Sequence, residues 1–171
     1  RLPTQTQYND DWIELVKSDF EKIADFYLSI FGQCSFLEYQ ETEHQLYWFG
    51  KRGLGFDLNA GSAAKLRKLI KENEEYQIFK VILGGDLSYS DNWEEEDWDF
   101  QKVREHRHER IDEFLKDIPN DFEKWHKRLH TYAVDYKAGS GTSFEFMSDM
   151  LNKLGKERPD LALQLLEDAK S

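Results

Sequence analysis

Proline occurs at only three positions in this chain, and this scarcity constrains the fold more than any other feature. The three positions are Pro3, Pro119 and Pro159, so long stretches lack the residue that breaks helices. Apolar residues recur at steps of three and four along most of the chain, which places them on one face of a helix. The sequence therefore predicts a mainly α-helical protein whose helices are separated by short turns.

The first of these helices should run from about residue 10 to residue 31, with Gly32 at its end. Its apolar stripe consists of Trp12, Val16, Phe20, Ile23, Tyr27 and Ile30. Phe26 and Phe31 add apolar groups outside that stripe. Because apolar residues then occupy more than one side, we expect this helix to be buried on more than one side.

Caps and apolar stripes also indicate where the later helices begin and end. Ser62 is the expected N-cap of a helix whose Leu66, Leu69 and Ile70 face inward, and Asn120 is the expected N-cap of another. The remaining predicted segments are residues 76–83, 98–118, 120–136, a helix from 144 that stops near Gly155, and a last helix that begins at Pro159. The breaks between the later helices are short, which favours antiparallel neighbours.

Residues 34–58 fit either of two structures. As a helix, the segment would place Phe36, Gln40 and His44 on one face. Its aromatic content favours strand, whereas its Glu and Gln content favours helix. We favour the helix. The alternative is a small β-hairpin within residues 34–58, which would make the fold α+β.

The helices predict one domain over residues 9–171, after a flexible start at residues 1–8. At 171 residues the chain is long enough to bury a core of its own. Antiparallel helical hairpins that stack as a short solenoid or bundle are the expected architecture. Because the first residue is Arg1 rather than Met, we expect the chain to be a piece of a longer protein.

Charge and cysteine content argue against several classes of function. The net charge is −11, which disfavours generic nucleic-acid binding because phosphates require a basic surface. The chain has one cysteine, Cys34, so it can form no internal disulfide and no cysteine-rich zinc site. No run of about 18 apolar residues is present, and we expect no membrane association. These features predict a cytoplasmic protein that requires no cofactor.

Residues 76–168 have a loose hydrophobic spacing that is typical of helices. It runs through the stretches YQIFKVILGGD, WEEEDWDFQKVREHRHERIDEFLKDI, FEKWHKRLHTYA and FMSDMLNKLGKERPDLALQLLED. The most telling part is KERPDLALQLLE, where a proline at a helix start is followed by Leu-Ala-Leu. This spacing resembles HEAT- and TPR-like helical repeats. Such segments occur in large multidomain proteins, including bacterial defence proteins of the STAND class. The resemblance implies a role in recognition or domain packing and assigns no catalytic residue; residues 34–58 depart from it.

An acidic segment that contains two tryptophans precedes and enters the helix predicted over residues 98–118. Its central residues are Trp93, Glu94, Glu95, Glu96 and Trp98. The carboxylates suit the positive end of the helix that follows, so a helix-entry loop is one interpretation. A loop that is merely solvated does not require tryptophans, so a docking surface for a basic partner is another. The basic residues from Lys102 to Arg110 are expected to form the solvated outer face of the helix.

Three histidines are the candidates for a metal site. His126 and His130 are four residues apart on one predicted helix, a spacing that can place two imidazoles on one metal ion. A turn near Pro119 would bring His108 close to the level of His130. His126 and His130 lie beside the apolar stripe rather than on it, where half-exposed polar residues normally lie. We therefore favour ordinary surface histidines.

Together with the resemblance, these features predict a non-catalytic helical protein-interaction or scaffold module. Its partner would be another protein or another domain of the same protein. One alternative is a metal-dependent enzyme with a site of histidines and carboxylates between the helices at 98–118 and 120–136. The other is an acidic nucleic-acid mimic, which the even spread of 23 basic residues argues against.

Overall fold

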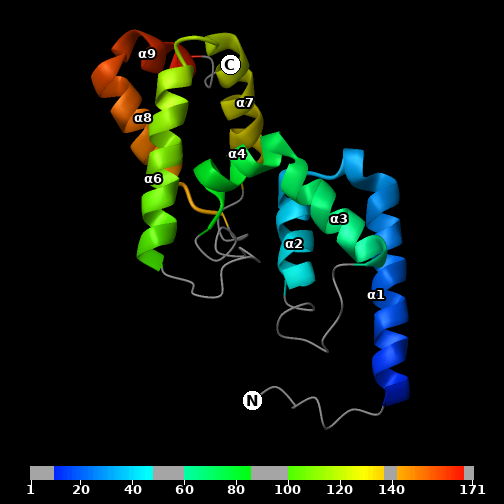
Figure 1. Cartoon of the computed structure of the whole chain (residues 1–171). Helices are drawn as coiled ribbons and strands as arrows, with labels where there is room; N and C mark the ends of the chain where they lie inside the picture. Colours follow the sequence, from blue (N-terminus) through cyan, green and yellow to red (C-terminus); the bar gives the residue numbers. More distant parts are fainter. Residues whose placement is uncertain (1–9, 48–59, 86–99, 137–141, 168–171) are drawn as a thin grey trace. The chain divides into compact units, whose positions relative to one another are not determined.

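Helices form almost the whole of the described structure (Figure 1). The computed structural model describes residues 10–47, 60–85, 100–136 and 142–167. Its elements are α1 (Asp10–Ile30), the short 3-10 helix η2 (Phe31–Gln33), α2 (Phe36–Tyr47), α3 (Gly61–Glu72), α4 (Glu74–Leu83), α6 (Phe100–Asp117), α7 (Phe122–Asp135), α8 (Glu145–Glu157) and α9 (Pro159–Glu167). These described residues contain no strand, so the prediction of a mainly α-helical fold is confirmed. None of the helices in these ranges combines the length and the apolar character that crossing a membrane would require.

The chain divides into two compact units, residues 1–76 and residues 77–171, with the boundary inside α4. The sequence predicted one helical domain over residues 9–171, and the helical pattern gave no sign of this division. Each unit has its own buried apolar residues. In the first unit these are Phe20, Ala24, Tyr39, Leu46, Ala63, Leu66, Ile70 and Tyr76. In the second they come from α4, α6, α7, α8 and α9.

In the first unit, α3 packs against both α1 and α2. Its inward face consists of Ala63, Leu66 and Ile70, which are nearly inaccessible to water. Leu69 was expected on this face, but it is 40% exposed. Leu69 points about 100° away from Ile70, at the edge of the face that meets α1 and α2.

The N-terminus of α3 is capped by acidic residues of α1, and the prediction that Ser62 is the N-cap is wrong. The helix begins at Gly61, which has a φ of 72°, a conformation that glycine adopts without strain. The backbone N–H of Ser62 donates to Glu21 Oε2 at 2.7 Å, and its hydroxyl donates to the carboxylate of Asp25. Carboxylates stabilise the positive end of a helix. Charge as well as apolar contact therefore joins α1 and α3.

The favoured helix within residues 34–58 is confirmed over α2, and residues 48–58 lie outside the described residues. A capping box begins this helix. Ser35 donates to Glu38 Oε2 from its backbone N–H at 2.7 Å and from its hydroxyl at 2.9 Å, and the Glu38 N–H donates back to Ser35 Oγ at 3.3 Å. The hydrogen bonds from the Ser35 backbone and side chain lower the pKa of Glu38.

Replacing Ser35 with alanine should lower the free energy of unfolding by about 1 kcal/mol at neutral pH, the usual effect of losing an N-cap. Because the pKa of Glu38 is lowered in the folded state, its contribution is present above its ordinary pKa and is lost as the pH falls through the folded value. The difference between the two proteins should therefore shrink from about pH 7 to about pH 3 in urea titrations. Ser29→Ala is the matched control, since Ser29 donates only to a carbonyl of its own helix. Equal losses in both variants would contradict the cap.

In the second unit, the part of α4 from Gln77 onward is buried on almost every side. Ile78, Phe79, Val81, Ile82 and Leu83 are all buried, and the Phe79 ring meets that of Tyr132 in α7 edge to face at 5.5 Å. A helix that is apolar all round belongs at the centre of a bundle. This buried position accounts for the strand-like composition of residues 76–83. The prediction that these residues form a helix is confirmed.

The C-terminus of α4 is held by a buried arginine of α6. Arg107 is 0% exposed, and its guanidinium donates to Val81 O at 2.8 Å and to Gly84 O at 2.8 Å. The same group lies 3.6 Å from the centre of the Phe146 ring in α8. The expectation of a solvated face over residues 102–110 is therefore wrong for Arg107. Carbonyls at a buried helix end need donors, and arginine supplies five.

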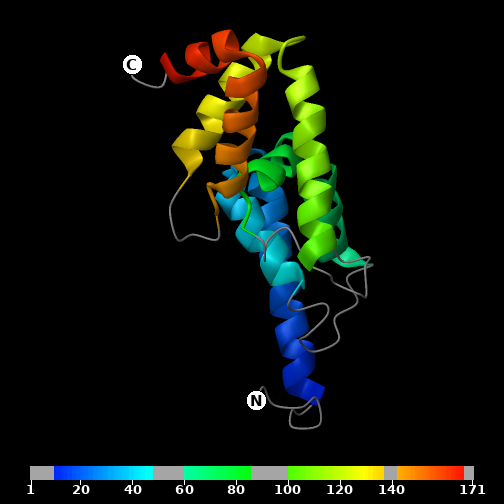
Figure 2. The ribbon, with the colours of Figure 1, turned by 90° about the vertical axis from the view of Figure 1, so that its left-hand side faces the viewer.

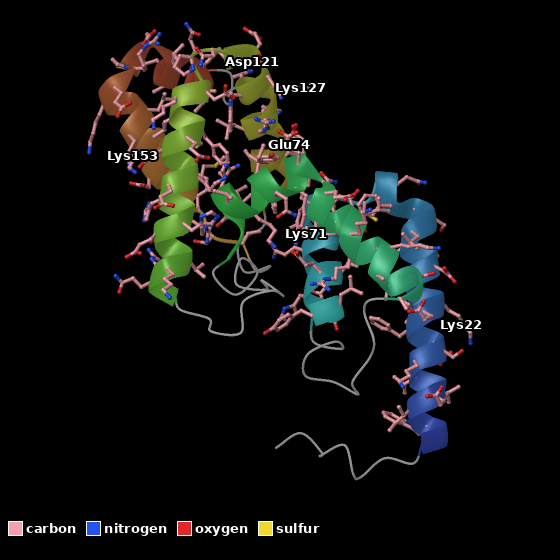
Figure 3. The ribbon with its side chains drawn as sticks, in the orientation of Figure 1. Lys22, Lys71, Glu74, Asp121, Lys127 and Lys153 are labelled. Carbon is pink, nitrogen blue, oxygen red and sulfur yellow. The ribbon has the colours of Figure 1, made fainter. Side chains whose placement is uncertain are left out.

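Helices α6 and α8 lie side by side (Figures 1 and 2) and are joined by a ladder of three polar side-chain pairs. The pairs are Arg104–Glu145, His108–Asp149 and Asp112–Lys153. The two members of each pair are 41 residues apart, and successive pairs advance by four residues on both helices, so α6 and α8 run parallel. Lys153, labelled in Figure 3, donates to Asp112 at 2.9 Å, which raises the pKa of the lysine. The hydrogen bond from Arg104 lowers the pKa of Glu145.

Of three further predictions about where helices begin or end, the structure confirms one. Asn120 does not cap α7, because its side-chain amide donates to the carbonyl of Lys116 at the end of α6 at 3.1 Å. Helix α8 continues past Gly155, where it was expected to stop. Pro159 is the first residue of α9, as predicted, since proline lacks only an N–H that would have no partner there.

Candidate functional site

The first unit contains a cavity of about 500 Å³ between α1 and α2. Its first wall is one face of α1, formed by Val16, Asp19, Phe20, Ile23, Ala24 and Tyr27. Its second wall comes from α2, through Glu41, Thr42, Gln45 and Leu46, and Leu66 of α3 completes the lining. The steps of three and four along α1 mean that a single helix face forms the first wall. A cavity of this size falls in the range of specific binding sites.

Large apolar side chains on α1 stand exposed at the border of this wall, and one of them, Ile23, also lines the cavity. We call Trp12, Leu15, Ile23 and Phe26 the α1 ridge; they are 43%, 57%, 54% and 59% exposed. The expectation that this helix is buried on more than one side is therefore wrong for the ridge. Exposed apolar residues that gather beside a cavity are typical of a binding surface.

Acidic residues border the cavity on both walls. Asp19 lies in the middle of the α1 ridge, and Glu41 lines the opposite wall; these two carboxylates are the acidic rim. Asp19 pairs with Lys22 at 2.9 Å (Lys22 is labelled in Figure 3), and Glu41 accepts a hydrogen bond from Gln45 at 2.6 Å. Six acidic and two basic residues occur in α1, and α2 has three acidic residues and no lysine or arginine. The cavity thus combines an apolar lining with a negatively charged border.

The docking residues predicted from the sequence, Trp93, Glu94, Glu95, Glu96 and Trp98, lie outside the described residues. Their role in binding stays a prediction. The cavity between α1 and α2 was missed from the sequence. Its signal is present in the sequence, because Phe26 extends the apolar surface of α1 beyond a single stripe, but the same pattern also predicts burial.

The three candidate metal ligands lie in different surroundings. His108 lies 5.1 Å from the Phe146 ring, and its Nδ1 is 3.5 Å from Asp149 Oδ2. His126 and His130 line a smaller cavity of about 170 Å³ whose other recorded lining residues are all apolar. Among the residues that the structure describes, no three His, Cys, Asp or Glu side chains form a group that could hold a metal ion. The described residues thus lend no support to a metal-dependent enzyme.

Cys34 lacks the surroundings of a reactive nucleophile. Its thiol donates weakly to the carbonyl of Ile30, with the sulfur 3.6 Å from that oxygen. Burial raises the pKa of the thiol, and the negative charge of Glu38 raises it further. A reactive cysteine requires the opposite environment, one that stabilises the thiolate.

Comparisons with protein-family models, curated proteins and solved structures gave no match to this chain. The features that bear on its function are the cavity between α1 and α2, the α1 ridge and the acidic rim. They describe an apolar cleft with negatively charged walls in a unit built from helices.

Proposed function

We propose that this chain is a non-catalytic helical protein-interaction module that binds its partner in the cavity between α1 and α2. The α1 ridge carries the proposal, because it leaves large apolar side chains exposed at the border of a cavity that Ile23 of the same ridge lines. Covering apolar surface stabilises a complex by about 25 cal/mol per Å² before the cost of association. The ridge therefore offers a partner apolar area that the described residues of this unit leave exposed.

The second unit supports a scaffold role within a larger protein. Its parallel α6 and α8 have the arrangement that the first helices of two stacked hairpins would adopt. We therefore propose that the partner is another protein or another domain of the same protein. The acidic segment with Trp93 and Trp98 is a second proposed contact for a basic partner. A single cysteine, Cys34, suits the reducing cytoplasm.

Peptides selected from a random display library on the wild-type chain should bind the cavity. The double variant Ile23→Ser and Phe26→Ser should weaken their binding by about tenfold or more, because truncating the central apolar contacts of an interface typically costs more than about 1 kcal/mol. Fluorescence anisotropy with labelled peptides measures the change. Both residues are more than half exposed, so the variant should keep its fold, which circular dichroism checks.

The matched control is Val134→Ser with Leu163→Ser, two apolar residues of the second unit that are 70% and 59% exposed. This control removes a comparable amount of exposed apolar surface and should leave peptide affinity unchanged. If the selected peptides lose affinity equally for both double variants, or for neither, the cavity between α1 and α2 is not the binding site.

A further inference from the structure

The shape of the cavity between α1 and α2 suits a helical ligand. The α1 wall from Val16 to Tyr27 is about 16 Å long at a rise of about 1.5 Å per residue, which matches three turns of a helix. Both walls are themselves helices, and the side-chain ridges of a third helix pack into the groove between two others. The described residues contain no strand that could pair with an extended peptide.

The charge of the cavity walls indicates the sign of the charge that a ligand should carry. Asp19 and Glu41 stand on opposite walls, so a helix lying between them would bring its flanks to one carboxylate on each side. Each carboxylate is already bonded within its own helix, which orders it, and a carboxylate accepts several hydrogen bonds at once. Lysine or arginine on the two flanks would complement both walls.

The unit already holds one helix of this kind. Helix α3 packs against α1 and α2 and carries four basic residues and one acidic residue: Lys65, Arg67, Lys68, Lys71 and Glu72. Its apolar face lies inward, and its N-terminus meets Glu21 and Asp25 of α1. The acidic α1 and α2 thus accept a basic amphipathic helix on one side, while the cavity lies open on another.

We infer that the partner segment is a cationic amphipathic helix of about three turns, an inference that rests on the proposed interaction function. Its apolar residues, spaced at three and four, fill the cavity over Phe20 and Leu66 and cover the α1 ridge. Its lysine or arginine side chains pair with Asp19 and Glu41. This is the mode in which an amphipathic helix lays its apolar face into a groove, with charge deciding which helices are accepted.

Synthetic peptides of about 14 residues, or four turns, test the inference directly. All have leucine on one helical face; the other positions are lysine in the first, glutamine in the second and glutamate in the third. A fourth peptide has the lysine composition in an order that destroys the apolar face. The lysine peptide should bind the full chain at least about tenfold tighter than the other three in fluorescence anisotropy. Its amide shift changes in nuclear magnetic resonance spectra should map to α1 and α2.

Variants of the rim separate specific pairing from the general attraction of an acidic protein. The double variant Asp19→Asn and Glu41→Gln should lower the affinity for the lysine peptide by about tenfold and leave the affinity for the glutamine peptide unchanged. Glu105→Gln with Glu109→Gln removes the same charge from exposed positions of α6 and should leave both affinities unchanged. Equal weakening by the two double variants would overturn the inference, because the attraction would then not come from the rim.

Other outcomes distinguish a failure of the inference from a failure of the proposed function. If the glutamine or glutamate peptide binds the cavity as tightly as the lysine peptide, the cationic partner is refuted and the binding site stands. If the chain itself dimerises in sedimentation, and Ile23→Ser with Phe26→Ser abolishes the dimer, the occupant is a second copy and the inference is refuted. If neither these peptides nor display-selected ones bind the cavity, both the inference and the proposed function fail.

Discussion

Replacing Arg107 with alanine should lower the free energy of unfolding by about 2–5 kcal/mol, the usual cost of truncating a large buried side chain to alanine. The substitution leaves the carbonyls of Val81 and Gly84 without their donor in a site closed to water. It also empties the space over the Phe146 ring and so adds a cavity penalty. Urea denaturation followed by circular dichroism measures the loss. Since whole domains are stabilised by about 5–15 kcal/mol, the second unit should be close to unfolding.

Two companion variants make this expectation specific. Arg107→Lys keeps the charge but replaces the planar guanidinium with a single ammonium, so we expect an intermediate loss. Arg110→Ala, three residues along the same helix, removes a side chain that is 42% exposed and pairs with Glu113. An exposed pair contributes about 0–1 kcal/mol. If Arg107→Ala cost no more than Arg110→Ala, the role assigned to the buried guanidinium would be wrong.

Alanine at Gly84 should lower the free energy of unfolding by about 1–3 kcal/mol, the usual cost of overpacking. A Cβ there would lie 2.5 Å from the carbonyl oxygen of Lys80, which is backbone and cannot turn aside. The residue cannot simply shift, because its N–H donates to that same oxygen at 3.0 Å and its carbonyl accepts from Arg107. The neighbouring Leu83 carbonyl is also fixed, by the N–H of Ser143 at 2.8 Å.

Gly155→Ala is the matched control for Gly84→Ala, with the opposite expected sign. A Cβ at Gly155 would meet only the Cβ of Ala162, at the ordinary contact distance of 3.9 Å. Glycine inside a helix costs about 0.5–1 kcal/mol relative to alanine, so this variant should be more stable than the wild type by that amount. Thermal melts of the two variants side by side would show the contrast, and a stabilised Gly84→Ala protein would contradict it.

The sequence allowed the helices to be predicted because their apolar spacing is a local property. It also allowed α4 to be predicted as helix, although its β-rich composition pointed the other way. It did not allow the burial of the Arg107 side chain to be predicted, since nothing in the local sequence distinguishes this residue from Arg104 or Arg110 on the same helix. The difference arises from tertiary structure, because Arg107 is placed where it reaches the carbonyls at the end of α4.

The cavity between α1 and α2 could not be predicted for a related reason. An apolar helix face has the same sequence pattern whether it is covered by its own chain or by a partner. Phe20 and Ala24 are buried, whereas Ile23 and Phe26 on the same helix are more than half exposed. The pattern of α1 therefore predicted burial correctly for one part of its surface and wrongly for the α1 ridge. The positions of α2 and α3 determine which part of the α1 surface is buried and which part is exposed.

The ladder between α6 and α8 favours one alignment of the two helices over those shifted by one turn. If α8 moved by one turn in one direction, Asp112 would face Glu157 and His108 would face Lys153. A turn in the other direction would set Asp112 against Asp149. Either slip sets the carboxylate of Asp112 against another carboxylate, which is penalised, whereas the observed alignment pairs opposite signs at Arg104 and Lys153.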